Sequence, residues 1–186
     1  MTKLLKTRML AALLFTFVAS AALAQNPTAQ GTINATLINS SGLAIAFDSA
    51  TGGVPLGASG SSAATLNFGT IAAYGAVPAG VTRTGPSGGS FTVSTPFSVK
   101  VTAGGLSSQS YTLTAQLASA APTGLTYKVD SVTLSTGSQT VQANGAYGSD
   151  VGHTLYLQAL TAPASGGGPA VGSALTDTIN FTATAN

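Results

Sequence analysis

Apolar and polar residues alternate along most of this chain, and this period of two constrains the fold more than any other feature. Such alternation is typical of β-strands that bury one face and expose the other. No window after residue 24 shows a helical period, so the sequence predicts eight to ten strands and an all-β fold. The expected inward-facing residues are Ile33, Ala35, Leu37, Leu43, Ile45, Phe47, Leu66, Phe68, Phe91, Val93, Phe97, Val99, Val101, Tyr111, Leu113, Ala115, Leu117, Leu125, Tyr127, Val129, Val132, Leu134, Leu155, Leu157, Ala159, Ile179, Phe181, Ala183 and Ala185.

Glycine and proline punctuate these stretches. The dipeptides Gly104-Gly105, Thr136-Gly137 and Asn144-Gly145 are typical of tight turns between strands. Pro96 interrupts one stretch, and because proline has no amide hydrogen to donate, we expect a sheet edge or a bulge there. Short strands at regular spacing, separated by turn signals, predict a β-sandwich or a barrel.

The N-terminus has the pattern of a secretory signal. Three basic residues among the first eight precede an apolar run over residues 9–18, and small residues then lead to Ala24. The apolar run is shorter than the roughly 20 residues that a membrane-spanning helix needs, which argues against an uncleaved anchor. We therefore predict a signal peptide over residues 1–24, cleavage between Ala24 and Gln25, and one exported domain over residues 25–186.

Removal of the signal would leave a chain of 162 residues with very few charges. Three basic residues remain against four aspartates, a net charge of −1, whereas charged residues make up about a quarter of a typical domain. Nucleic acid binding requires a basic patch, so the composition excludes that class of partner. The chain has no cysteine, and its stability has to come from packing and strand pairing. A nearly uncharged surface suits a protein that packs against copies of itself.

Residues suited to catalysis are scarce. Asp150 and His153 lie three residues apart and could form a triad with a serine, but no nucleophile-elbow motif accompanies them. We interpret His153 as a strand-start residue at the rim of a loop. The chain also lacks the spaced ligands of zinc and calcium sites and the glycine patterns of phosphate-binding loops. We expect no catalytic residue, no cofactor and no metal, and so no enzyme activity.

Three segments resemble a known family. They are the alternating strand over 31–38, the segment Leu66-Asn-Phe-Gly-Thr-Ile over 66–71, and the C-terminal stretch over 177–186. Together they resemble the pilin and spore-coat-U-like subunits of bacterial chaperone–usher systems, although the cysteine pair of many such subunits is missing here. The resemblance implies an immunoglobulin-like β-sandwich that lacks one strand. A periplasmic chaperone, and then the N-terminal strand of the next subunit, would complete it by strand addition.

The resemblance points to a donor strand within residues 25–38. Gly31, Ile33, Ala35 and Leu37 share one face of this segment and would fill the groove of a neighbour. An ordinary first strand of a complete sandwich explains the same alternation, and both interpretations stay open.

The expected function follows from the resemblance. The chain would be a structural subunit of an extracellular fibre or surface coat, exported through the periplasm to the cell surface as part of a fimbrium. Its partners would be copies of itself in a head-to-tail polymer, a periplasmic chaperone and an outer-membrane usher. The alternative is a monomeric secreted binding module, for example for surface glycans, although Tyr74 and Tyr147 in expected loops form no aromatic platform.

Overall fold

A computed structural model describes residues 32–34, 43–87, 89–105, 107–161 and 175–186, and only the backbone of 32–34. The expected signal peptide and its cleavage site at Ala24 and Gln25 lie outside these residues. The described part of the chain is all-β, as the alternation predicts. It contains no helix that is long and apolar enough to cross a membrane.

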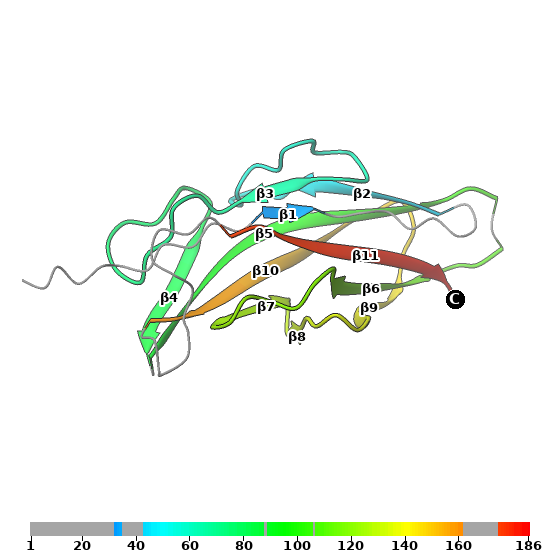
Figure 1. The fold of residues 1–186 in the computed structure, drawn as a ribbon. Coiled ribbons are helices and arrows are strands. Elements are labelled where there is room, and N and C mark those ends of the chain that lie inside the picture. Colours follow the sequence, from blue (N-terminus) through cyan, green and yellow to red (C-terminus); the bar gives the residue numbers. More distant parts are fainter. Residues whose placement is uncertain (1–31, 35–42, 88, 106, 162–174) are drawn as a thin grey trace, which may run out of the picture.

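The strands form two sheets that face each other (Figure 1). One sheet has the order β3-β1-β11-β6-β9, and the other has the order β2-β5-β10-β7-β8 with β4 beside β5. All pairs are antiparallel except β1 with β11. The strands are β1 (Thr32–Asn34), β2 (Leu43–Ser49), β3 (Thr65–Asn67), β4 (Thr82–Ser87), β5 (Ser90–Ala103), β6 (Tyr111–Leu117), β7 (Leu125–Val129), β8 (Val132–Thr133), β9 (Gln139–Gly145), β10 (Asp150–Leu160) and β11 (Asp177–Ala185).

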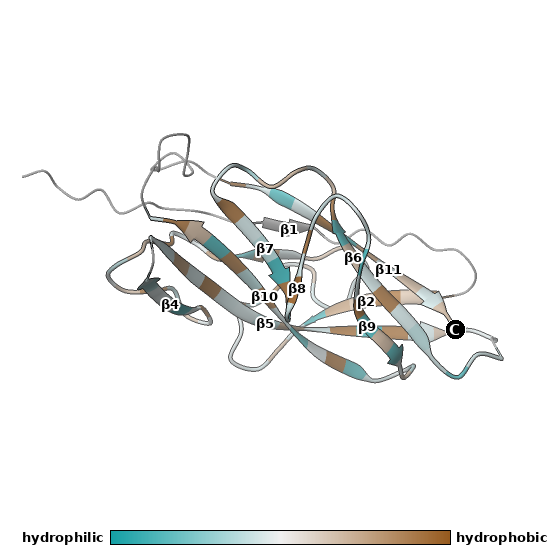
Figure 2. Ribbon diagram, turned by 90° about the horizontal axis from the view of Figure 1, so that it is seen from below, coloured by the Kyte–Doolittle hydropathy of each residue, from teal (hydrophilic) through white to brown (hydrophobic). Residues whose placement is uncertain are grey.

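The hydrophobic core lies between the two sheets. Every expected inward-facing residue from Leu43 to Ala183 is buried except Val132, which is half-buried like Ala185. Hydrophobic and hydrophilic residues alternate along the strands in Figure 2. Full burial of a large aliphatic or aromatic side chain stabilises a fold by about 1.5–3 kcal/mol, so packing between the sheets can hold this domain together without disulfides.

Pro96 does not mark an edge, and that expectation was wrong. It lies inside β5, a continuous central strand of 14 residues in which Pro96 pairs with Thr154 of β10. On its other side β5 pairs with β4 up to Ser94 and with β2 only from Phe97. Pro96 therefore lies where the neighbour of β5 changes from β4 to β2. Neither strand pairs with Pro96, so neither requires the amide hydrogen that proline lacks.

Asn144-Gly145 is not a hairpin turn either. The two residues end β9, and the register against β6 shifts nearby, from Tyr111 opposite Gly145 to Leu113 opposite Gln142. Asn144 has a φ of 54°, which is typical of the extra residue in a β-bulge. Gly145 is buried, and a Cβ at this position would come within 2.3 Å of the Tyr111 ring. The glycine therefore provides space for that ring.

Replacing Gly145 by alanine should destabilise the domain. The added methyl group would force the Tyr111 ring or the β9 backbone to move, and such overpacking costs about 1–3 kcal/mol. Urea denaturation of the exported protein measures the change. Gly137→Ala is the matched control, because the nearest atom to its added carbon is 3.6 Å away. Equal stability of the two variants would contradict the close contact.

Candidate functional site

The short strand β1 lies between β3 and β11, in the middle of a sheet order rather than at an edge. Its Ile33 is opposite Leu66 in the antiparallel pairing with β3, and opposite Asp177 in the parallel pairing with β11. β1 thus links the final strand of the chain to β3. Without β1, the two strands would face each other across a gap one strand wide. We call this gap the β3–β11 cleft.

Within the described residues, the edge of β11 that faces the cleft is paired only in part. β6 pairs with β11 over the seven residues from Ile179 to Ala185 on one side. On the other side, β1 pairs with Asp177 and Thr178, and no other described strand pairs with that edge. An unpaired strand edge presents backbone donors and acceptors to any extended segment that approaches. The described residues of β1 therefore use only the first part of this edge.

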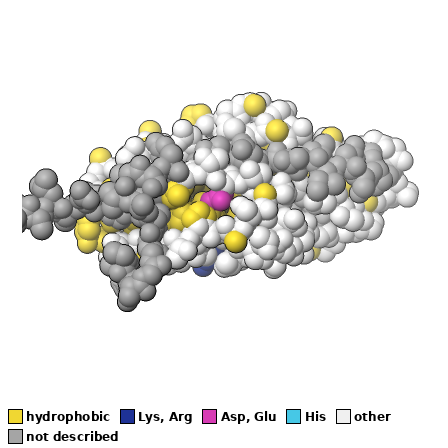
Figure 3. Space-filling model, viewed as in Figure 1, with side chains coloured by type: hydrophobic (Ala, Val, Ile, Leu, Met, Phe, Trp, Pro, Cys, Tyr) yellow, Lys and Arg dark blue, Asp and Glu magenta, His cyan; other side chains and the backbone are white. Residues whose placement is uncertain are grey.

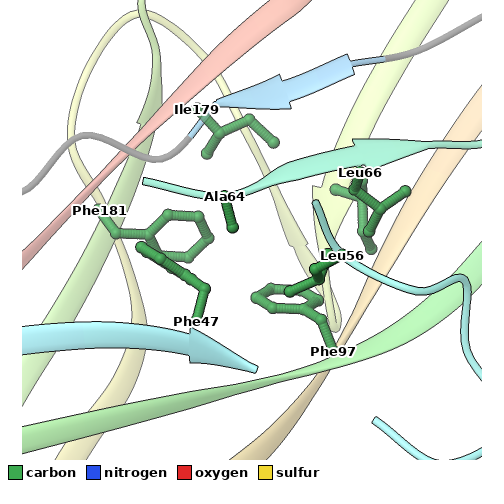
Figure 4. A pocket seen from close by; sticks show the side chains of 8 residues that line it. Phe47, Leu56, Ala64, Leu66, Phe97, Ile179 and Phe181 are labelled. Carbon is green, nitrogen blue, oxygen red and sulfur yellow. The ribbon is translucent and has the colours of Figure 1, made fainter. Parts of the chain in front are cut away.

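An apolar pocket opens into the same region (Figure 4). Leu66 of β3 and Ile179 and Phe181 of β11 form one side of it. The other side comes from the facing sheet and from two loop residues. The full lining consists of Phe47, Leu56, Ala64, Leu66, Phe97, Leu155, Ile179 and Phe181. Its volume of about 20 Å³ can accommodate one small group, and a lining without polar side chains favours a methyl group over water.

Three phenylalanines hold the pocket wall in place. The Phe181 ring makes edge-to-face contacts with Phe47 at 5.3 Å and with Phe97 at 6.0 Å between ring centroids. These rings come from β11, β2 and β5, so the contacts join the two sheets. Aromatic pairs of this geometry add about 0.5–1.5 kcal/mol beyond their area burial. The Phe181 ring therefore anchors the pocket wall to both sheets.

A buried carboxylate lies at the start of β11. Asp177 is 6% exposed, and the Tyr127 hydroxyl of β7 in the opposite sheet donates a hydrogen bond to its Oδ2. Burial, this hydrogen bond and the nearby negative charge all raise the pKa of Tyr127 above its ordinary value. On the face in Figure 3, hydrophobic side chains gather around an acidic side chain near β1 and β11. The sequence did not reveal this pair, although Asp177 is in phase with Ile179 and Phe181.

The Tyr127–Asp177 contact predicts how stability depends on pH. The folded-state pKa of Tyr127 lies above the unfolded value of 10.0, so its contribution is complete below pH 10 and is lost as the pH rises further. Tyr127→Phe should leave Asp177 without this donor and lower the free energy of unfolding at pH 7 by about 1–3 kcal/mol. It should also flatten the fall in stability above pH 10. Burial raises the pKa of Tyr111 as well, so some alkaline dependence should remain.

Chemical denaturation at pH 7 and at several values above pH 10 measures both effects. Tyr156→Phe, on the outer face of β10, controls for the loss of a tyrosine hydroxyl. A Tyr127→Phe protein that keeps both its stability and its alkaline profile would contradict the role of this contact.

The expected donor residues fall mostly outside the described structure. The backbone of Ile33 lies in the middle of β1, within the cleft. Gly31, Ala35 and Leu37 lie outside the described residues. The cleft thus contains a part of the segment that we expected to be a donor, and here it belongs to the same chain.

The structure does not bring Asp150 and His153 together. Asp150 pairs with Lys100 at the surface, 3.1 Å from its Nζ. His153 is buried, not at a loop rim, and its Nδ1 lies 2.8 Å from Oδ2 of Asp130. Its Nε2, which would face the nucleophile in a triad, has no hydrogen-bond partner among the described residues. The His153–Asp130 pair is therefore a packing element that connects β10 to the β7–β8 turn.

This burial reverses what the sequence suggests for His153→Ala. The sequence alone predicts almost no effect, whereas removal of a buried ring beside Phe97 should cost about 2–4 kcal/mol. Asp150→Ala is the control, because an exposed ion pair contributes only about 0–1 kcal/mol. Thermal unfolding of both variants gives the ranking. A smaller loss for His153→Ala than for Asp150→Ala would contradict the buried position.

No protein-family model matches the chain, and no curated protein matches it either. In the described part of the chain, no three histidine, cysteine or acidic residues gather as potential metal ligands.

Proposed function

We propose that this protein is a structural subunit of an extracellular fibre or surface coat, assembled by strand addition between copies. One observation carries the proposal: a segment from the N-terminal part of the chain fills the β3–β11 cleft beside the final strand. A cleft that accepts an extended segment of one chain has the same shape for that segment from another chain. Backbone hydrogen bonds then supply affinity, and the apolar pocket selects the side chain.

The way β1 connects to the rest of the fold allows such an exchange. Among β2 to β11, only β3 and β11 pair with β1, so an exchange of β1 leaves the other described strand pairs unchanged. Exchange of an identical element between copies adds few new contacts and loses few, so it costs little. An exchange in which each copy donates to the next is head-to-tail and does not close, and it therefore extends into a filament.

The wider setting of the proposal rests on the sequence. The low charge of the chain suits close contact between copies, and the N-terminal pattern suits export through the periplasm. A two-sheet fold whose last strand needs a partner fits an immunoglobulin-like subunit that lacks one strand. A periplasmic chaperone that supplies a strand to the cleft, and an outer-membrane usher that exchanges it, would be the corresponding partners.

Disulfide trapping tests whether β1 enters a neighbour. Asn34 of β1 is opposite Thr65 of β3, and such cross-strand pairs have Cα separations of about 4.5–5.5 Å, suitable for a disulfide. The chain has no cysteine of its own to interfere. We expect co-expressed Asn34→Cys and Thr65→Cys chains to form mixed dimers after oxidation, seen on a non-reducing gel. The double variant should give a ladder of linked multimers.

The control pairs Asn34→Cys with Thr133→Cys, an exposed position on β8 of the other sheet, and should give no dimers. If the double variant forms only an intramolecular disulfide and the mixture gives no dimers, β1 completes its own domain and the fibre proposal is wrong. If neither disulfide forms, β1 does not occupy the cleft at all, which also overturns the proposal.

A further inference from the structure

A polar groove lies on the outer face of the other sheet. It has a volume of about 320 Å³, within the range of small-molecule sites. Its floor comes from β5, β10 and β7, and the β7–β8 turn closes one end. The lining residues are Thr92, Thr126, Lys128, Asp130, Ser131, Tyr156 and Gln158. The groove is on the sheet opposite to the β3–β11 cleft and does not depend on the function proposed for that cleft.

Strand register arranges these side chains in two rows. In one row, Gln158 of β10 lies between Thr92 of β5 and Thr126 of β7. In the next, Tyr156 lies beside Lys128 of β7. Neighbouring strands are about 4.8 Å apart, and residues two positions apart along a strand are about 6.7 Å apart. The threonine side chains of the first row are shorter than those of Tyr156 and Lys128 in the second, and this difference in length forms the hollow.

Within the described part of the chain, most of the polar groups in the groove have no hydrogen-bond partner. Tyr156, Lys128 and the two threonines make no side-chain hydrogen bond to another described residue. Gln158 uses only its amide nitrogen, which donates to Ser90 Oγ at 3.2 Å. Asp130 is held in place because Oδ1 accepts from the Thr154 amide and Oδ2 contacts His153, each at 2.8 Å. The Asp130 carboxylate therefore has a fixed orientation at one end of the groove.

We infer that this groove binds a neutral saccharide, through the Tyr156 ring and the polar side chains around it. Sugar hydroxyls both donate and accept hydrogen bonds, and the groove offers hydroxyls, an amide oxygen, an ammonium group and a carboxylate. A half-buried tyrosine ring provides an apolar surface and a polar tip, which suits the CH face and the hydroxyl rim of a pyranose.

The charges favour a neutral ligand. Lys128 and Asp130 bring one positive and one negative group to the lining, and within the described structure they form no salt bridge with each other. An anionic ligand would gain from Lys128 but lie beside the Asp130 carboxylate, and like charges at short range repel. The aromatic residues of the expected loops do not contribute. Tyr147 packs against Tyr111 with ring centroids 5.4 Å apart, and its hydroxyl bonds to Ser110 O.

Saturation-transfer NMR with the exported protein tests this inference. The probes are free oligosaccharides that end in glucose, galactose, mannose or N-acetylglucosamine, and sialylated and sulfated oligosaccharides of matched length. We expect at least one neutral probe to bind. Tyr156→Ala and Gln158→Ala should each weaken that binding about tenfold, which corresponds to about 1.4 kcal/mol for the contact that each removes. Gln116→Ala, at a half-buried position on β6 of the other sheet, should bind as the unmodified protein does.

The outcomes separate the alternatives. Binding of anionic probes alone, lost in Lys128→Ala, would overturn the neutral class. Binding that survives both groove variants would place the ligand elsewhere and overturn the site. A folded protein that binds none of the probes would also overturn it. Circular dichroism of each variant shows whether it is folded. The disulfide-trapping pattern of Asn34→Cys and Thr65→Cys should be the same in the Tyr156→Ala background, which keeps this test distinct from that of strand addition.

Discussion

A strand that covers an apolar core needs a hydrogen-bonding partner on each side, or its free edge remains available to other chains. In this protein that requirement falls on β11, the last strand. Its inner face contributes Ile179, Phe181 and Ala183 to the core, so it cannot leave the sheet. Its outer edge is paired only over Asp177 and Thr178 by the described part of β1. The position of β1, the pocket beneath the cleft and the proposed assembly all depend on how this edge is satisfied.

The period of two was sufficient to predict an all-β fold and the residues that face its core, because a residue's phase fixes which face of the strand it occupies. The same phase places Asp177 inward. Alternation alone does not reveal that its hydrogen-bond partner is Tyr127, which lies fifty residues earlier on the other sheet. His153 was misjudged for a related reason. Its partner Asp130 lies in the turn after the neighbouring strand β7. Asp150 is closer in sequence, but it pairs with Lys100 instead.

The missed features share a physical cause: they depend on which strands become neighbours. Pro96 is acceptable inside β5 only because two different strands end beside it. The groove around Tyr156 exists only because β7, β10 and β5 lie side by side in that order. Strand order is set by long-range packing and not by local pattern, so sequence periodicity could show that Tyr156 faces outward but not what surrounds it.

The pairing of β1 with β11 joins residues near opposite ends of the chain, and this has a kinetic consequence. A chain is synthesised from its N-terminus, so the segment around Ile33 appears first and its partner around Asp177 appears late. Closing so long a loop carries an entropic cost, and pairs distant in sequence form late in folding. For that interval the early segment and the late edge are both unoccupied. The early segment can then pair with the late edge of its own chain, which is a unimolecular step, or with that of another chain, which is a bimolecular step. The local concentration of subunits decides which step is faster.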